Sequence, residues 1–275
     1  MARTVLITGA SGNIGTKIAP FLKQRYVLRL VDIRGGSEVL SADLSIYQDH
    51  WAKQFEGVDT VIHLAGEMRP AASWQSCYSG NVLGTRNVLS ASRKAQVRRV
   101  IFASTNQIMA GYRFLDVQVT SDAEPKPLNP YAISKLICEE LGKSFCEETG
   151  ISFIALRIGM LQTGENIPRP GMGIGLWGQQ MWLSDRDAQR AIECSIEAKD
   201  ISFSILNLVS QNFGMRWDMS ETEHVIGFQP QDSYTPVLSE SDKHQDDKAR
   251  RASLVPGYWL DQHFNQLGHS QELQT

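Results

Sequence analysis

The chain has 275 residues, of which 42% are hydrophobic and 21% charged, and its formal net charge is −3. This composition can bury a sizeable core and excludes a disordered or fibrous chain, and it lacks the basic excess that favours nucleic acid or an anionic membrane. No apolar run reaches the roughly 18 residues of a membrane-spanning helix, and the first run, 5–7, is too short for a signal peptide. We therefore expect a cytoplasmic protein with neither nucleic-acid nor membrane partners.

Strand-like and helix-like segments alternate through the first part of the chain. Several of the strand-like runs are apolar on both faces, which is typical of a parallel sheet covered by helices on both sides. In chain order we expect a strand at 4–7, a helix at 14–23, strands at 27–31 and 39–44, a helix at 48–55, a strand at 58–64, a helix at 80–94, a strand at 100–103, a helix at 132–148 and a strand at 151–157.

The pattern changes after the strand at 151–157. A stretch rich in Gly and Pro, 163–178, predicts a long loop. Beyond it we expect a helix to 199 whose start is capped by Ser184 and Asp187, a strand at 201–209, a solvated helix or mobile tail over the mixed-charge run 240–251, and a polar end.

A glycine-rich loop, Thr-Gly-Ala-Ser-Gly-Asn-Ile-Gly at 8–15, follows the first expected strand. Gly9, Gly12 and Gly15 would permit a tight turn, let a diphosphate approach the backbone, and let the next helix pack closely on the sheet. Asp32 closes the second strand, where an acid accepts hydrogen bonds from an adenosine ribose. The sequence therefore predicts a doubly wound Rossmann sheet that binds a dinucleotide.

Asp32 also bears on the choice of dinucleotide. A carboxylate at this place repels a 2′-phosphate, so we expect NAD rather than NADP. Arg34, two residues further on, would soften that preference.

Tyr131 and Lys135 stand four residues apart at the start of a helix-like segment, so their side chains share one face. A lysine ammonium beside a phenol stabilises the phenolate and lowers the pKa of the tyrosine, which suits it to act as a base. Ser104 and Thr105 leave the end of a strand, where hydroxyls point into the crevice in which α/β sheets bind ligands. These residues predict an acid–base site.

The four cysteines, Cys77, Cys138, Cys146 and Cys194, form no Cys-x-x-Cys pair. This spacing disfavours a zinc or redox site, so we expect no metal and buried thiols in a reducing compartment.

A soft boundary is expected at residue 158. Residues 1–158 would form the NAD-binding Rossmann core with the catalytic helix. Residues 159–275 would form a small C-terminal substrate-binding lobe and tail, interleaved with the core as one structural unit.

Together these motifs resemble the extended branch of the short-chain dehydrogenase/reductase superfamily, whose members are NAD-dependent sugar epimerases, dehydratases and dehydrogenases. The resemblance covers about residues 4–160, with its motifs in the family's order. It rests on the loop 8–15, Asp32, Asp43-Leu44, His-Leu-Ala-Gly at 63–66, Asn81 within Asn-Val-Leu-Gly-Thr-Arg-Asn-Val-Leu, Ser104-Thr105, and Asn-Pro-Tyr-Ala-Ile-Ser-Lys at 129–135.

The resemblance implies a role for each catalytic position. Tyr131 would be the general base or acid, and Lys135 would assist it and hold the nicotinamide ribose. Thr105 would hydrogen-bond the reacting oxygen, with Ser104 as runner-up, and Asn81 would hold the active-site helix and its water. NAD would contact Gly9, Ser11, Gly12, Asn13, Ile14, Gly15, Asp32, Ile33, Asp43, Leu44, Leu64, Ala65 and Gly66, together with Asn81, Tyr131 and Lys135.

Two further expectations come from the same comparison. Family members usually dimerise through the helices that carry Asn81 and Tyr131, which implies a homodimer. The neighbours of His63 make it a structural residue at a strand end and not a base.

Members of this family catalyse dehydration, epimerisation or dehydrogenation. Dehydratases of this branch carry two acids where this chain has Asn106 and Gln107, and amides have no such acid–base function. Epimerases hold a nucleotide diphosphate with a larger C-terminal lobe. We therefore expect an oxidoreductase that transfers hydride between NAD and a hydroxyl or hemiacetal carbon of a sugar, sugar acid or other small alcohol or aldehyde. The alternatives are an NDP-sugar 4-epimerase with tightly bound NAD and a non-enzymatic NAD(H)-sensing protein.

Several segments are similar to uronate dehydrogenases, which oxidise free sugar acids to lactones. Where those enzymes grip the substrate with polar side chains, this chain has Gln107, Met68 and Met160, and the methionines make the pocket more apolar than a sugar acid needs. The expected substrate contacts are Met68, Thr105, Asn106, Gln107, Met160 and Arg169, with Trp177 and Trp182 near the covering loop.

Overall fold

The computed structural model describes residues 2–253, in which one sheet has seven strands, all of them parallel. The strand order is β3-β2-β1-β4-β5-β6-β7. This arrangement confirms the predicted Rossmann fold. The strands are β1 (Thr4–Thr8), β2 (Val27–Asp32), β3 (Val39–Ser41), β4 (Thr60–His63), β5 (Arg99–Thr105), β6 (Ser152–Ile158) and β7 (Phe203–Leu208).

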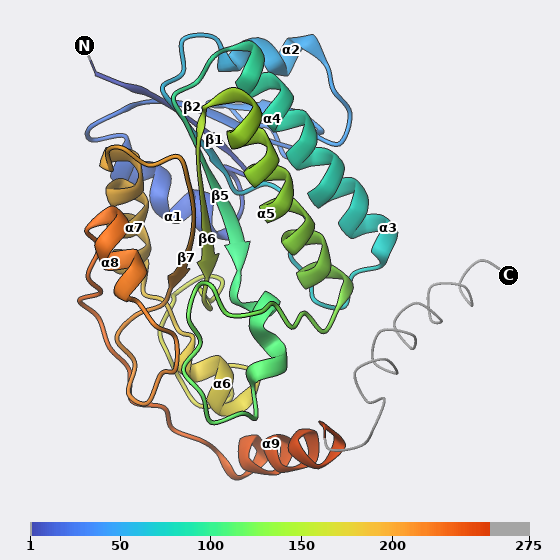
Figure 1. The fold of residues 1–275 in the computed structure, drawn as a ribbon, viewed down its shortest axis with the longest axis vertical. Coiled ribbons are helices and arrows are strands. Elements are labelled where there is room, and N and C mark those ends of the chain that lie inside the picture. Colours follow the sequence, from blue (N-terminus) through green and yellow to red (C-terminus); the bar gives the residue numbers. More distant parts are fainter. Residues whose placement is uncertain (1, 254–275) are drawn as a thin grey trace, which may run out of the picture.

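Helices cover both faces of this sheet, with α1, α7 and α8 on one side and α4 and α5 on the other (Figure 1). In the described part of the chain the α-helices are α1 (Asn13–Leu22), α2 (Asp49–Ala52), α3 (Trp74–Cys77), α4 (Gly84–Lys94), α5 (Pro130–Thr149), α6 (Gly175–Gln180), α7 (Asp185–Glu197), α8 (Ser220–Ile226) and α9 (Glu240–Ser253). Shorter helical segments are η1 (Lys53–Phe55), the π-helical η2 (Tyr78–Leu83) and η3 (Asn106–Tyr112).

The two faces of the sheet have separate hydrophobic cores. Val5 and Ile7 of β1 point into the core under α1 and α7, whereas Leu6 points into the core under α4 and α5. Successive side chains of a strand alternate between faces, so a strand buried on both sides must be apolar at every position. This explains why the apolar runs in the sequence identify the strands.

The strand order reverses beside β1, because the chain passes from β1 to β2 and β3 on one side and then crosses to β4 on the other. In open α/β sheets the ligand crevice lies at such a reversal, outside the carboxyl ends of the strands. The loop after β1 and the segments after β4 and β5 therefore meet at this edge.

Two expected elements differ from the structure. The helix expected at 80–94 begins earlier, at Trp74, because the side chain of Ser73 caps α3 and η2 joins α3 to α4. The loop expected at 163–178 becomes helical at Gly175, because Trp177 of α6 packs against Trp217 in a third hydrophobic cluster.

The expected cap of α7 and a helix over the mixed-charge run are both present. The hydroxyl of Ser184 accepts a hydrogen bond from the amide of Asp187 at 2.9 Å and caps α7. The mixed-charge run is helical, as α9, and the polar end after residue 253 lies outside the described residues. All four cysteines are free thiols, and three of them are buried. Among the described residues, no helix is both long and apolar enough to cross a bilayer.

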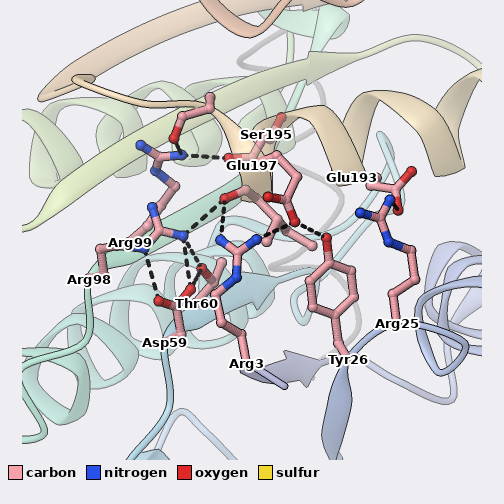
Figure 2. Close-up of polar contacts among 12 residues, drawn as sticks. Arg3, Arg25, Tyr26, Asp59, Thr60, Arg98, Arg99, Glu193, Ser195 and Glu197 are labelled. Atoms are coloured by element: carbon pink, nitrogen blue, oxygen red, sulfur yellow. Dashed lines mark hydrogen bonds and ion pairs between the residues drawn. The ribbon is translucent and has the colours of Figure 1, made fainter. Parts of the chain in front are cut away.

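Figure 2 shows arginines converging on the carboxyl end of α7, near the amino ends of the strands. Arg99 of β5 donates to the carbonyls of Ser195 and Ala198 at 2.7 and 2.8 Å and to the hydroxyl of Ser152 at 2.9 Å. Its neighbour Arg98 donates to a carbonyl of the same helix end. These cations satisfy the last carbonyls of α7 and complement its dipole.

We expect Arg99→Met to lower the free energy of unfolding by about 2–4 kcal/mol, because it removes three buried hydrogen bonds from a charged donor. Urea unfolding followed by circular dichroism measures this change. Arg98→Met is the matched control and should cost about 1 kcal/mol or less, since that side chain is partly exposed. Equal losses in the two variants would contradict the assignment of Arg99 as the main anchor.

Candidate active site

A cleft of about 830 Å³ lies at the carboxyl ends of the strands. It brings together residues that lie as far apart in the sequence as Gly9 and Leu161. Of the predicted cofactor-binding and catalytic residues, those that line it are Gly9, Gly12, Asn13, Ile14, Gly15, Asp32, Ile33, Asp43, Leu44, Leu64, Ala65, Gly66, Thr105, Tyr131 and Lys135. Ser11 and Asn81 lie beside it and contact residues of the site.

The glycine-rich loop has no room for a side chain at Gly9 or Gly15. Gly9 has a φ of +72°, and a Cβ there would lie 2.6 Å from the amide nitrogen of Ala65. A Cβ on Gly15 would lie 2.4 Å from the carbonyl oxygen of Gly9. Because α1 begins at Asn13, its first amides face this cradle without intrahelical partners. The cradle fits a diphosphate bound at a helix start.

Asp32 lies buried at the end of β2. Its two carboxylate oxygens accept hydrogen bonds from the amides of Ser11 at 3.0 Å and Arg34 at 2.8 Å. The Arg34 guanidinium is largely exposed and lies 3.8 Å from the same carboxylate. Each carboxylate oxygen has a second lone pair, so Asp32 can still accept from a ribose hydroxyl.

The carboxyl end of β5 lies against the start of α5, where the catalytic residues were predicted. α5 begins there because Asn129 caps the amide of Ala132 at 2.8 Å and Pro130 occupies the first turn. The buried ammonium of Lys135 donates to the carbonyl of Ala103 at 2.9 Å. The hydroxyl of Thr105 faces the phenol of Tyr131 closely enough to lower its pKa.

The expected lowering of the pKa of Tyr131 is not what the structure shows. Burial of the phenol raises its pKa above the ordinary value, and the nearby hydroxyl of Thr105 offsets this only in part. Burial also lowers the pKa of Lys135, since a charged ammonium is costly to desolvate. The sequence showed that the two groups are neighbours, but not that Lys135 would be buried and Tyr131 largely shielded from water.

Asn81 lies on η2 and joins it to α5. Its amide nitrogen donates to the hydroxyl of Ser134 at 2.8 Å. Its side-chain oxygen is buried and accepts no hydrogen bond within residues 2–253, so it can accept one from a bound water. A Cβ on Gly66 would lie 2.3 Å from that oxygen, so the glycine allows the approach.

Ser104 and His63 are occupied elsewhere. The hydroxyl of Ser104 donates to Glu139 at 2.5 Å, so it is held by α5, and Thr105 is the hydroxyl that meets Tyr131. The buried ring of His63 contacts the hydroxyls of Thr8 and Thr85 at 2.7 and 3.1 Å. Burial lowers the pKa of His63 to about 3, which agrees with a structural role.

The structure separates the residues expected to contact substrate. Met68 lines the cleft and is 62% exposed, and Thr105 lines it too. Asn106 is buried beside Thr105 and does not line the cleft, and neither atom of its amide has a partner among the described residues. The others do not line the cleft: Gln107, Met160, which packs on the third hydrophobic cluster, and Arg169, which is exposed.

Sequence reasoning missed an acidic residue of this cleft, Glu67. Its carboxylate lines the cleft with a side chain only 11% exposed, and accepts hydrogen bonds from Arg69 and from the hydroxyl of Ser76. Hydrogen bonds from Arg69 are the main cause that lowers the pKa of Glu67 to about 2, so the group is ionised at neutral pH. The sequence did offer one signal for this residue, because Glu67 follows shortly after the expected strand at 58–64, at the end of the sheet where ligands bind.

No cluster of three or more potential metal-ligating side chains occurs in the part of the chain that the structure describes. The donors found in the cleft are amides, hydroxyls and single carboxylates, and the glycine cradle and Asp32 fit a dinucleotide.

The chain matches the NAD dependent epimerase/dehydratase family over residues 5–165. It is 32% identical to the L-arabinose 1-dehydrogenase (NAD(P)(+)) of Haloferax volcanii, over 86% of this chain and 100% of that protein. It is also 32% identical to the NAD-dependent glucose-6-phosphate dehydrogenase of that organism, over 85% of this chain and 95% of the other. Both similarities extend well beyond the nucleotide-binding half.

Among solved structures, glucuronic acid dehydrogenase from Chromohalobacter salexigens is similar with a TM-score of 0.73 and 25% identity, over 90% of each chain. The predicted family, the NAD cofactor and the dehydrogenase activity are thereby confirmed, and a dehydrogenase is better supported than the alternative epimerase. The chain belongs to the NAD dependent epimerase/dehydratase family and is an NAD-dependent dehydrogenase.

Proposed function

We propose that this dehydrogenase oxidises the C1 hemiacetal hydroxyl of a neutral aldose to a lactone, with NAD as hydride acceptor. The observation that carries the choice of a neutral sugar is the buried carboxylate of Glu67 in the wall of the cleft. A fixed negative charge there repels an anionic substrate and leaves a neutral one unaffected.

In the proposed reaction, the phenolate of Tyr131 takes the proton of the C1 hydroxyl. Thr105 would hydrogen-bond the same oxygen and orient it, and Lys135, one helical turn along α5, would support the phenolate with its positive charge. The unpartnered side-chain oxygen of Asn81 would hold a water close to Lys135. NAD, when bound, supplies the electrophilic carbon that accepts the hydride from C1, so the sugar is oxidised by two electrons and NADH is formed.

NAD would lie along the cleft from the glycine cradle to Tyr131. The amides that start α1 would hold the diphosphate, and Asp32 the adenosine ribose. The same path would bring it past Ser11, Asn13, Ile14, Ile33, Asp43, Leu44, Leu64 and Ala65.

Glu67 is placed to act on the reacting end of the cleft. Its charge is among the causes that raise the pKa of Tyr131, which puts the two groups within electrostatic reach. Arg69 offsets part of this charge, because it gives two guanidinium nitrogens to Glu67. Its guanidinium is 74% exposed and does not line the cleft, so Glu67 is the member of the pair that faces the cleft. Met68 would complete the substrate contacts.

We also propose that the chain works as a cytoplasmic homodimer. The free thiols suit a reducing compartment. Ile133, Ile137 and Leu141 lie on α5 and are only partly buried, so this face has apolar surface left for a second copy. Analytical ultracentrifugation of the purified protein tests the dimer.

D-Galactose and D-galacturonate differ only at C6 and form a matched substrate pair. We expect kcat/KM for galactose to exceed that for galacturonate about tenfold, the equivalent of roughly 1.4 kcal/mol, since the carboxylate of Glu67 repels that of galacturonate. NADH absorbance measures both rates, and Glu67→Gln should narrow the ratio. If neither these sugars nor L-arabinose and glucose 6-phosphate yield NADH, the proposed function is wrong.

Because burial raises the pKa of Tyr131, the base form is scarce at neutral pH, so oxidation should speed up as pH rises into the alkaline range. Initial rates across pH at saturating NAD and sugar measure this. Tyr131→Phe should lower kcat about 10²- to 10⁴-fold and leave NAD affinity nearly unchanged. A variant that retains most of its kcat would exclude Tyr131 as the base.

Asp32→Ser should lower kcat/KM for NAD about tenfold, the equivalent of roughly 1.4 kcal/mol, and raise it for NADP. The physical reason is that the variant loses the ribose acceptor and the charge that repels a 2′-phosphate, while Arg34 stays close by. In the double variant Asp32→Ser, Arg34→Ala, the increase in kcat/KM for NADP should disappear. Unchanged cofactor preference in Asp32→Ser would contradict the assignment.

A further inference from the structure

Three consecutive residues at the carboxyl end of β5 contact three successive turns of α5. The carbonyl of Ala103 accepts from Lys135, the hydroxyl of Ser104 donates to Glu139, and the hydroxyl of Thr105 meets the phenol of Tyr131. Two of these contacts involve residues of the proposed reaction. The third, to Glu139, has no part in it.

Glu139 is completely buried and binds β6 as well as β5. Its two oxygens accept from the Arg157 guanidinium at 3.0 and 2.9 Å, while one of them also accepts from Ser104. The side chains of Arg157 and Glu139 are 2% and 0% exposed. Arg157 also donates to the carbonyl of Ser121 at 3.1 Å, which ties the segment before α5 to the same cluster.

Such a pair contributes little to stability on balance. The cost of taking both charges out of water roughly cancels their attraction, so apolar residues of similar size at the two positions are often as stabilising. A forked guanidinium–carboxylate contact does, however, fix direction and distance more tightly than apolar packing. What it fixes here is the placement of α5 relative to the ends of β5 and β6.

We propose that Glu139 and Arg157 are positioning residues for the reaction, a role that rests on the proposed function. Together with Ser104 they fix the position of α5 along β5 and β6. In that position Tyr131 and Lys135 face Thr105 across the cleft. An error of about 1 Å in such placement can cost on the order of 10²-fold in rate. The pair therefore acts on kcat through Tyr131 and Lys135 and touches neither substrate nor NAD.

The test removes the whole cluster without stranding a buried charge. The triple variant Ser104→Ala, Glu139→Leu, Arg157→Met replaces it with apolar side chains and should keep the melting temperature of the native protein. We expect kcat to fall at least about tenfold, with the Kd for NAD changed less than about twofold. A folded triple variant with native kcat would overturn the proposal.

A second variant covers the case in which the triple variant does not fold. Arg157→Lys keeps the charge pair but loses the fork, so kcat should still fall while the protein stays folded. Arg99→Met is the matched control, because it removes a buried arginine from the opposite end of β5. It should lower stability and leave kcat unchanged, and an equal loss of kcat there would overturn the proposal by showing a general effect of instability.

A titration that needs no substrate separates this proposal from the proposed function. The phenolate absorbance of Tyr131 is obtained as the difference between each protein and its Tyr131→Phe counterpart. If the cluster positions Lys135 beside Tyr131, the triple variant should titrate at a pH different from the native protein, whatever the substrate. Identical titration curves would overturn the positioning role, whereas native protein inactive toward all sugars would overturn only the proposed function.

Discussion

A buried hydrogen bond from the ammonium of Lys135 to the carbonyl of Ala103 joins β5 to α5, the helix that carries the tyrosine. The contact is costly, because burial disfavours the charged lysine. It places the ammonium in the wall of the cleft and one helical turn from Tyr131. The hydroxyl of Thr105 and the carboxylate of Glu139 extend the same junction to either side. The proposed chemistry depends on this junction between β5 and α5.

The parallel sheet explains why the junction lies beside the glycine cradle. All the strands end at one edge, and the reversal of strand order beside β1 opens the crevice there. The opposite end of the strands is held by arginines that bind the end of α7. Stability and chemistry are thus divided between the two ends of the same strands, which allows Arg99 to serve as a control for Arg157.

The fold and the cofactor end of the site could be predicted from the sequence because they depend on local signals. Apolar runs identified the strands, and glycine spacing with Asp32 identified the cradle. The substrate end depended on tertiary contacts that spacing does not encode. The resemblance ranked Thr105 ahead of Ser104, but the sequence alone did not show that the buried Glu139 accepts a hydrogen bond from Ser104. Likewise, Met160 was expected in the pocket but packs in the lobe, while the carboxylate of Glu67 was not expected there.

The most direct test of the account follows the hydrogen on C1. The enzyme is incubated with NAD and an aldose that carries deuterium at C1, and both products are analysed by mass spectrometry. If oxidation takes place at C1, the NADH carries deuterium, with one deuterium atom transferred for each lactone formed. The reaction is then also slower than with unlabelled sugar. Free NADH without label, or a labelled sugar that changes configuration without forming NADH, would contradict oxidation at C1.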